Sequence, residues 1–122
     1  MGLSDYELPL NYLPGWIAKN TYGYHGDDGK MFGASFTHKG QMYGPTYTMG
    51  DVIGCCFNLA EKEIFFTKNG EKLDIAFKDV PSTALFPTVG MLGGKVEANF
   101  GESEFIFDFE KYLHHWRYKI YI

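Results

Sequence analysis

The sequence predicts an all-β domain followed by one short helix, and three features of its 122 residues support this. Short aromatic and aliphatic runs alternate with polar residues, which is the pattern of half-buried strands. Fifteen glycines separate these runs, as expected where tight turns join neighbouring strands. Apolar residues make up 45% of the chain, including eleven Phe and nine Tyr, so a single hydrophobic core can form.

The strands are predicted wherever an alternating run lies between turn residues. They are residues 21–25, 30–36, 52–59, 64–68, 72–77, 85–91 and 95–100, and the intervening loops include 5–20, 37–50 and 78–84. The pair Asn69-Gly70 is a strong hairpin signal, so residues 52–77 are expected to form a meander. Gly93-Gly94 predicts a second hairpin, and Phe105 and Phe107 continue the period of two.

The period changes near Asp108, a residue type suited to the N-cap of a helix. Phe109, Leu113, Trp116 and Ile120 then recur at the three- and four-residue steps of one helical face. The chain is therefore predicted to contain a β domain of residues 1–107 and a helical extension of residues 108–122.

Composition excludes several classes of partner. The formal charge is −4 and Lys and Arg do not cluster, so neither nucleic acid nor an anionic membrane is expected to bind. No apolar run approaches the roughly 20 residues that span a bilayer. Cys55 and Cys56 are neighbours, whose side chains point to opposite faces of a strand, so they are not expected to pair. This cysteine content fits a reducing, intracellular compartment.

The stretch Gly26-Asp27-Asp28-Gly29, preceded by His25, can be interpreted in two ways. Asp and Gly are typical of a tight turn between strands. The alternative is a metal-dependent hydrolase that uses His25, Asp27 and Asp28. Adjacent carboxylates on a turn usually diverge, and a calcium loop needs further ligands at spaced positions, so the turn is favoured. No metal or cofactor is expected.

Large apolar residues also stand in predicted loops, where polar residues are the rule. They are Tyr12, Leu13 and Trp16 in the first loop, and Met91 and Leu92 near Gly93. One interpretation is that they fold back and cap the core. The other is an exposed aromatic patch, which is the usual chemistry of a protein-binding surface.

Several segments together resemble the SPRY domain. They are Leu13-Pro-Gly-Trp16, Tyr22-Gly-Tyr-His-Gly-Asp-Asp-Gly29, Tyr43-Gly-Pro-Thr46, Gly50-Asp-Val-Ile-Gly-Cys-Cys56, Phe66-Thr-Lys-Asn-Gly70, Ile75-Ala-Phe77, Phe86-Pro-Thr-Val-Gly90 and Glu97-Ala-Asn-Phe-Gly101. The run from Tyr22 to Gly29 is specific to a smaller group of SPRY domains, and it resembles the Ran-binding-protein-M branch of the family. That branch is the scaffold subunit of the GID/CTLH ubiquitin ligase.

The resemblance implies a bent antiparallel β-sandwich that binds peptide segments or loops of partner proteins, ubiquitin-ligase subunits among them, without catalysis. The implied partner-binding residues are Tyr12, Leu13, Trp16, Tyr43, Met91, Leu92 and Gly93. Related domains carry Val-Trp-Gly where this chain has Met91-Leu92-Gly93, so an aromatic anchor is missing there. Full SPRY domains have strands before the equivalent of Gly2, so the resemblance implies an N-terminally truncated sandwich. It also implies a location in the cytoplasm, and in the nucleus as well.

Overall fold

The computed structural model describes residues 1–5, 9–16, 20–33, 39–81 and 84–120, with only the backbone described for 115–120. This part of the chain forms eight strands and one helix, which confirms the predicted all-β fold with a C-terminal helix. The elements are β1 (Gly2–Ser4), β2 (Thr21–Tyr24), β3 (Lys30–Gly33), β4 (Gln41–Met42), β5 (Ile53–Asn58), β6 (Glu63–Lys68), β7 (Glu71–Phe77), β8 (Phe86–Thr88) and α1 (Phe109–Ile120). Within the described ranges, no helix has the length and apolar character needed to cross a membrane.

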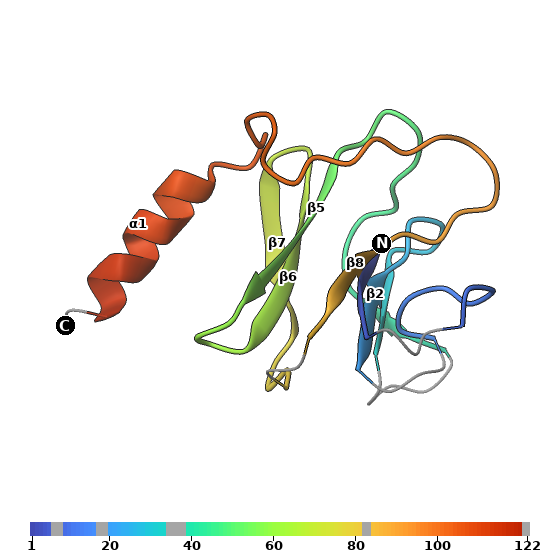
Figure 1. Ribbon diagram of the computed structural model, residues 1–122, viewed down its shortest axis with the longest axis horizontal. Helices are drawn as coiled ribbons and strands as arrows, with labels where there is room; N and C mark the ends of the chain where they lie inside the picture. Colours follow the sequence, from blue (N-terminus) through green and yellow to red (C-terminus); the bar gives the residue numbers. More distant parts are fainter. Residues whose placement is uncertain (6–8, 17–19, 34–38, 82–83, 121–122) are drawn as a thin grey trace.

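The strands make two antiparallel sheets. One has five strands in the order β4-β3-β2-β1-β8, and the other has three in the order β5-β6-β7. Figure 1 shows the three-stranded sheet between the five-stranded sheet on one side and α1 on the other. Three layers result, because the inner faces of the two sheets share a core and the outer face of the smaller sheet meets the helical segment.

Aromatic side chains fill the space between the sheets. Tyr24 of β2 packs on Phe66 of β6 with ring centroids 5.3 Å apart, and Tyr22 meets Phe77 of β7 at 5.0 Å. Burying such rings is the main favourable term in folding a domain of this size. The other buried core residues are Leu3, Met31, Ile64, Ala76 and Val80.

The Asn69-Gly70 hairpin is confirmed. Both residues have positive φ, 51° and 86°, and Lys68 pairs with Glu71 on either side of them. Two consecutive positive φ angles define the type I′ turn, whose twist matches that of the flanking strands. The local sequence therefore sets the register of β6 against β7.

The predicted C-terminal helix is also confirmed. Asp108 caps it, because its carboxylate oxygen Oδ1 accepts a hydrogen bond from the backbone N–H of Lys111 at 2.9 Å. Tyr112 from the first turns packs on Phe65 of β6, with ring centroids 5.1 Å apart. The division of the chain into residues 1–107 and 108–122 stays a prediction, since this contact crosses the proposed boundary.

The second predicted hairpin is wrong. Only Phe86–Thr88 form a strand, and β8 pairs with β1 in the register Ser4↔Phe86, while residues 95–100 form no strand. Alternation identifies residues that suit a strand, but the strand also needs a partner. Here the partner of β8 comes from the other end of the chain, and Val96 and Phe100 stay exposed.

Three smaller differences between the predicted and the observed strands also show that alternation alone does not define a strand. β1 and β4 were not predicted from the alternation, because strands of three and two residues carry almost no pattern. Residues 101–107 bend instead of continuing the period of two. The predicted strand over 30–36 ends at Gly33, and its last residues lie outside the described part of the chain.

Two tyrosines at the edge of the core give a prediction for alkaline pH. Burial raises the pKa of Tyr43 to about 12 and raises that of Tyr47 further. A phenol in the unfolded chain ionises near pH ~10, so folding favours the neutral form of both groups. Their contribution to stability is complete below pH ~10 and is lost as the pH rises from there through the folded pKa values. Denaturation followed against pH, together with near-ultraviolet absorbance of the phenolates, should show both tyrosines ionising only with unfolding.

Candidate partner-binding surface

The loop of residues 9–16 is a pair of hydrogen-bonded turns. The N–H of Tyr12 donates to the carbonyl of Pro9 at 3.1 Å, and that of Trp16 donates to the carbonyl of Leu13 at 3.2 Å. The N–H of Gly15 donates to the hydroxyl of Thr21 on β2. These bonds hold the loop in one shape against the five-stranded sheet.

Pro14 is the anchor of this loop in the fold. It is fully buried, and its carbonyl accepts a hydrogen bond from the ring Nε2 of His25 at 3.0 Å. The His25 ring stacks on Phe32 of β3 with centroids 4.1 Å apart, and burial lowers its pKa. His25 is therefore a neutral structural histidine that ties the loop to the sheet.

The aromatic side chains on either side of Pro14 reach the surface. Tyr12 is 39% exposed and Trp16 is 43% exposed, and their rings meet edge to face with centroids 6.2 Å apart. Of the side chains for which two interpretations were left open, Tyr12 and Trp16 therefore keep a large exposed area instead of folding back over the core, whereas Leu13 is half-buried.

The second apolar loop lies against the first. A Cβ atom on Gly90 would come within 2.4 Å of Cδ2 of Leu13, so the two backbones approach closely at this point. Met91 is half exposed, and Leu92 is fully exposed. This contact joins the loop that carries Tyr12, Leu13 and Trp16 to the loop that carries Met91 and Leu92, about 75 residues further along the chain, with exposed Gly93 next. We call these five side chains the two-loop surface.

Tyr43 is placed differently from the other implied binding residues. Its ring packs on Tyr24 and Phe66, at 5.1 and 5.9 Å between centroids. Its hydroxyl donates to the carbonyl of Asp74 at 2.6 Å and accepts from the N–H of Phe66 at 3.2 Å. The side chain is half-buried and joins the two sheets, a role that its position in a predicted loop did not reveal.

The Gly26–Gly29 stretch is a turn, as the residue types favoured. The carboxylate of Asp28 accepts a hydrogen bond from the N–H of Lys30 at 2.9 Å, and the N–H of Gly29 donates to the carbonyl of His25 at 3.1 Å. The His25 ring points to Pro14 instead of toward the carboxylates. Among the residues that the structure describes, no three His, Cys, Asp or Glu side chains are close enough to hold a metal ion. Nothing here supports the hydrolase alternative.

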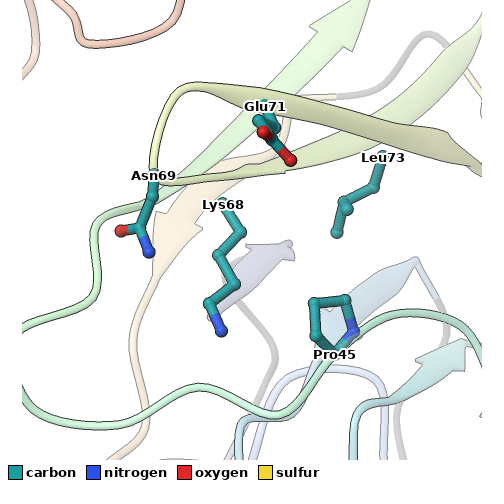
Figure 2. Close-up of a pocket in the computed structure, with 5 residues that line it drawn as sticks. All are labelled: Pro45, Lys68, Asn69, Glu71 and Leu73. Atoms are coloured by element: carbon teal, nitrogen blue, oxygen red, sulfur yellow. The ribbon is translucent and has the colours of Figure 1, made fainter.

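A pocket of about 340 Å³ lies at the β6–β7 hairpin, between the strands and Pro45 (Figure 2). It is lined by Pro45, Lys68, Asn69, Glu71 and Leu73. The ammonium of Lys68 donates to the carbonyl of Thr46 at 2.8 Å, and the amide of Asn69 donates to Asp51 at 2.9 Å. The hydrogen bond from Asn69 holds the pKa of Asp51 below its usual value. These polar groups serve the hairpin and its connection to β5.

Comparison with known proteins identifies the family. The family model of the SPRY domain matches residues 5–103. Ran-binding protein 9 of Xenopus laevis is 57% identical over 98% of this chain, and the human protein of the same name is 55% identical over 98%. A crystal structure of a human SPRY domain matches with a TM-score of 0.54 and 31% identity, covering 70% of this chain and 50% of that one.

The chain covers only a small part of the length of these relatives. This chain spans 22% of the Xenopus laevis protein and 16% of the human one. The matched residues include both loops of the two-loop surface and every strand from β2 to β8. The sequence, the two packed antiparallel sheets and the family match agree, and the chain belongs to the SPRY domain family.

Proposed function

We propose that this SPRY domain binds a peptide segment or loop of a partner protein on the two-loop surface. Members of the family are protein-interaction modules, and the match covers most of the chain. The contact of Leu13 with Gly90 carries the proposal, because it unites two loops whose large apolar side chains are exposed. The mechanism is recognition by a preformed surface, without catalysis.

The chemistry of the surface suits this role. Tyr12 and Trp16 offer a large contact area while losing little conformational freedom, since each ring has few rotatable bonds. The hydrogen bonds of Gly15 and Trp16 hold the loop before the partner arrives, which lowers the entropic cost of binding. Met91 and Leu92 add flexible aliphatic contacts, so we expect the partner segment to insert an apolar side chain.

The test uses a peptide selected from a random phage-displayed library against the purified chain. In titration calorimetry, Trp16→Ala should weaken binding of that peptide by about 30-fold, which corresponds to the ~2 kcal/mol typical of a central aromatic anchor. Leu13→Ala should act in the same direction. Leu59→Ala is the control, since Leu59 is an exposed apolar residue in the β5–β6 turn. Unchanged affinity in Trp16→Ala and Leu13→Ala, with the fold intact, would reject this surface.

We also propose that the domain recruits substrates within a ligase of the GID/CTLH type, in the cytoplasm and the nucleus. The support is the resemblance of residues 22–29 to the branch of Ran-binding protein M, together with relatives named Ran-binding protein 9 at 55–57% identity. Affinity purification of the tagged protein from source cells, followed by mass spectrometry, should recover other ubiquitin-ligase subunits. A purification that repeatedly lacks them would contradict the ligase assignment and leave the peptide-binding proposal standing.

A further inference from the structure

The outer face of the three-stranded sheet is covered by a short stretch of the chain near its C-terminal end. Phe65 of β6 points to this face and is completely buried. The rings of Phe107 and Tyr112 lie over it, at 6.0 and 5.1 Å between centroids, and they contact each other at 6.0 Å. We call residues 105–114 the outer cover. In Figure 1 it runs from the coil above the hairpin into the start of α1.

The outer cover is attached at few points. The amide of Asn58 on β5 donates to the hydroxyl of Tyr112 at 3.1 Å. Ile106 lies across the hairpin tip, where a Cβ on Gly70 would approach its Cγ2 within 2.8 Å. Other side chains of the cover are largely exposed, namely Phe105, Phe109, Glu110 and Lys111. The contacts described between the cover and the sheet are those of the Phe107 and Tyr112 rings with Phe65, the hydrogen bond from Asn58, and the approach of Ile106 to Gly70.

The sheets themselves are held together without the outer cover. β6 pairs with β5 through six consecutive residues and with β7 on its other edge. The inner core, built on Tyr24, Phe66 and Ile64, lies on the opposite face of β6 from Phe65. Lifting the cover would therefore remove two rings from Phe65 without breaking a strand pair or opening the core between the sheets. The ammonium of Lys72 on β7, 4.5 Å from the centroid of the Phe65 ring, would stay over it.

Cys55 and Cys56 distinguish these two faces of the same sheet. Cys55 packs against the core between the sheets. Cys56 stands opposite Phe65 in the β5–β6 register, so its side chain shares the outer face with Phe65. Burial raises the pKa of the Cys55 thiol to about 12 and that of Cys56 to about 11, so little of either thiol is thiolate near neutral pH, although both side chains are partly exposed.

We propose that the outer cover is a displaceable strap, which opens while the two sheets stay packed and exposes an aromatic face around Phe65 and Cys56. Tyr112 holds the strap closed, because its ring packs on Phe65 and its hydroxyl accepts a hydrogen bond from the amide of Asn58 on β5. Opening gives the domain a second apolar face, on the side of the β5-β6-β7 sheet that faces away from β1, β2, β3, β4 and β8.

The experiment measures how fast each thiol of the full 122-residue chain reacts with N-ethylmaleimide at pH 8. Fragmentation in the mass spectrometer between residues 55 and 56 locates the label. In Tyr112→Ala, Cys56 should react at least ten times faster than in the parent chain, while Cys55 keeps its rate. Tyr112→Phe keeps the ring and loses only the hydrogen bond to Asn58, so its effect should be smaller. Lys111→Ala, an exposed neighbour on the same helix, should change neither rate.

Two results would overturn the proposal that the outer cover is a displaceable strap. Equal acceleration of Cys55 and Cys56 would mean that the cover opens only when the whole domain unfolds. No acceleration of Cys56 would mean that Tyr112 does not close the outer face. If Tyr112→Ala does not fold, hydrogen exchange of the parent chain decides: amides of residues 112–114 should exchange at least 100 times faster than those of residues 64–67. Equal protection of the two segments would also reject the strap.

Discussion

Replacing Tyr24 with Ala is expected to lower the free energy of unfolding by about 3–5 kcal/mol, the range found when a large buried aromatic residue is truncated. The Tyr24 side chain is fully buried between the two sheets. Its ring contacts Phe66, Tyr43 and Tyr47, with centroids 5.3, 5.1 and 4.9 Å away. Truncation leaves a cavity at the point where β2, β6 and the loop of residues 43–47 meet, so all three lose packing.

Tyr24→Phe separates the ring from its hydroxyl. The hydroxyl donates a hydrogen bond to the carbonyl of Pro45, so its removal should cost only about 1 kcal/mol. Urea denaturation of the parent and the two variants measures both differences. Tyr12→Ala is the matched control, because Tyr12 is partly exposed and its truncation should change stability by less than about 0.5 kcal/mol. A Tyr24→Ala protein as stable as Tyr12→Ala would show that the core is not where these contacts place it.

The β5-β6-β7 meander could be predicted from the sequence because its determinants are local. Asn69-Gly70 sets the turn, and the alternation of Leu73, Ile75 and Phe77 sets the face. The pairing of β1 with β8 could not be predicted in this way. It joins residues such as Ser4 and Thr88, whose hydroxyls are 2.7 Å apart although 84 positions separate them. No local period carries information about a contact at that distance along the chain.

For the candidate surface too, local features could be predicted from the sequence and contacts between distant residues could not. Tyr12, Trp16 and Leu92 could be found because large apolar residues are unusual in loops, and the family resemblance named the same positions. The approach of Leu13 to Gly90 and the bond from His25 to Pro14 needed the structure. Both contacts depend on where β2 and β8 place His25 and Gly90, which come after these strands. The residue types alone do not determine these positions.

Gly15 and Gly50 offer a matched test of whether the shape of the first loop matters for binding. Both have positive φ, 88° and 92°, so alanine at either position carries the same left-handed strain of about 1–2 kcal/mol. The surroundings differ. A Cβ on Gly15 would lie 2.1 Å from the carbonyl oxygen of Phe32 on β3, whereas nothing lies within 4 Å of one on Gly50.

Gly15→Ala should therefore lose a further ~1–3 kcal/mol of stability relative to Gly50→Ala, because the loop must move away from β3. That movement redirects Trp16, which follows directly, and weakens its contact with a partner. We expect the selected peptide to bind Gly15→Ala about 30-fold more weakly, as it does Trp16→Ala, and to bind Gly50→Ala with parent affinity. Urea denaturation and calorimetry on the three proteins measure both quantities. Equal stability of the two variants would show that the loop does not lie against Phe32, and equal affinity would show that binding does not depend on the loop's position.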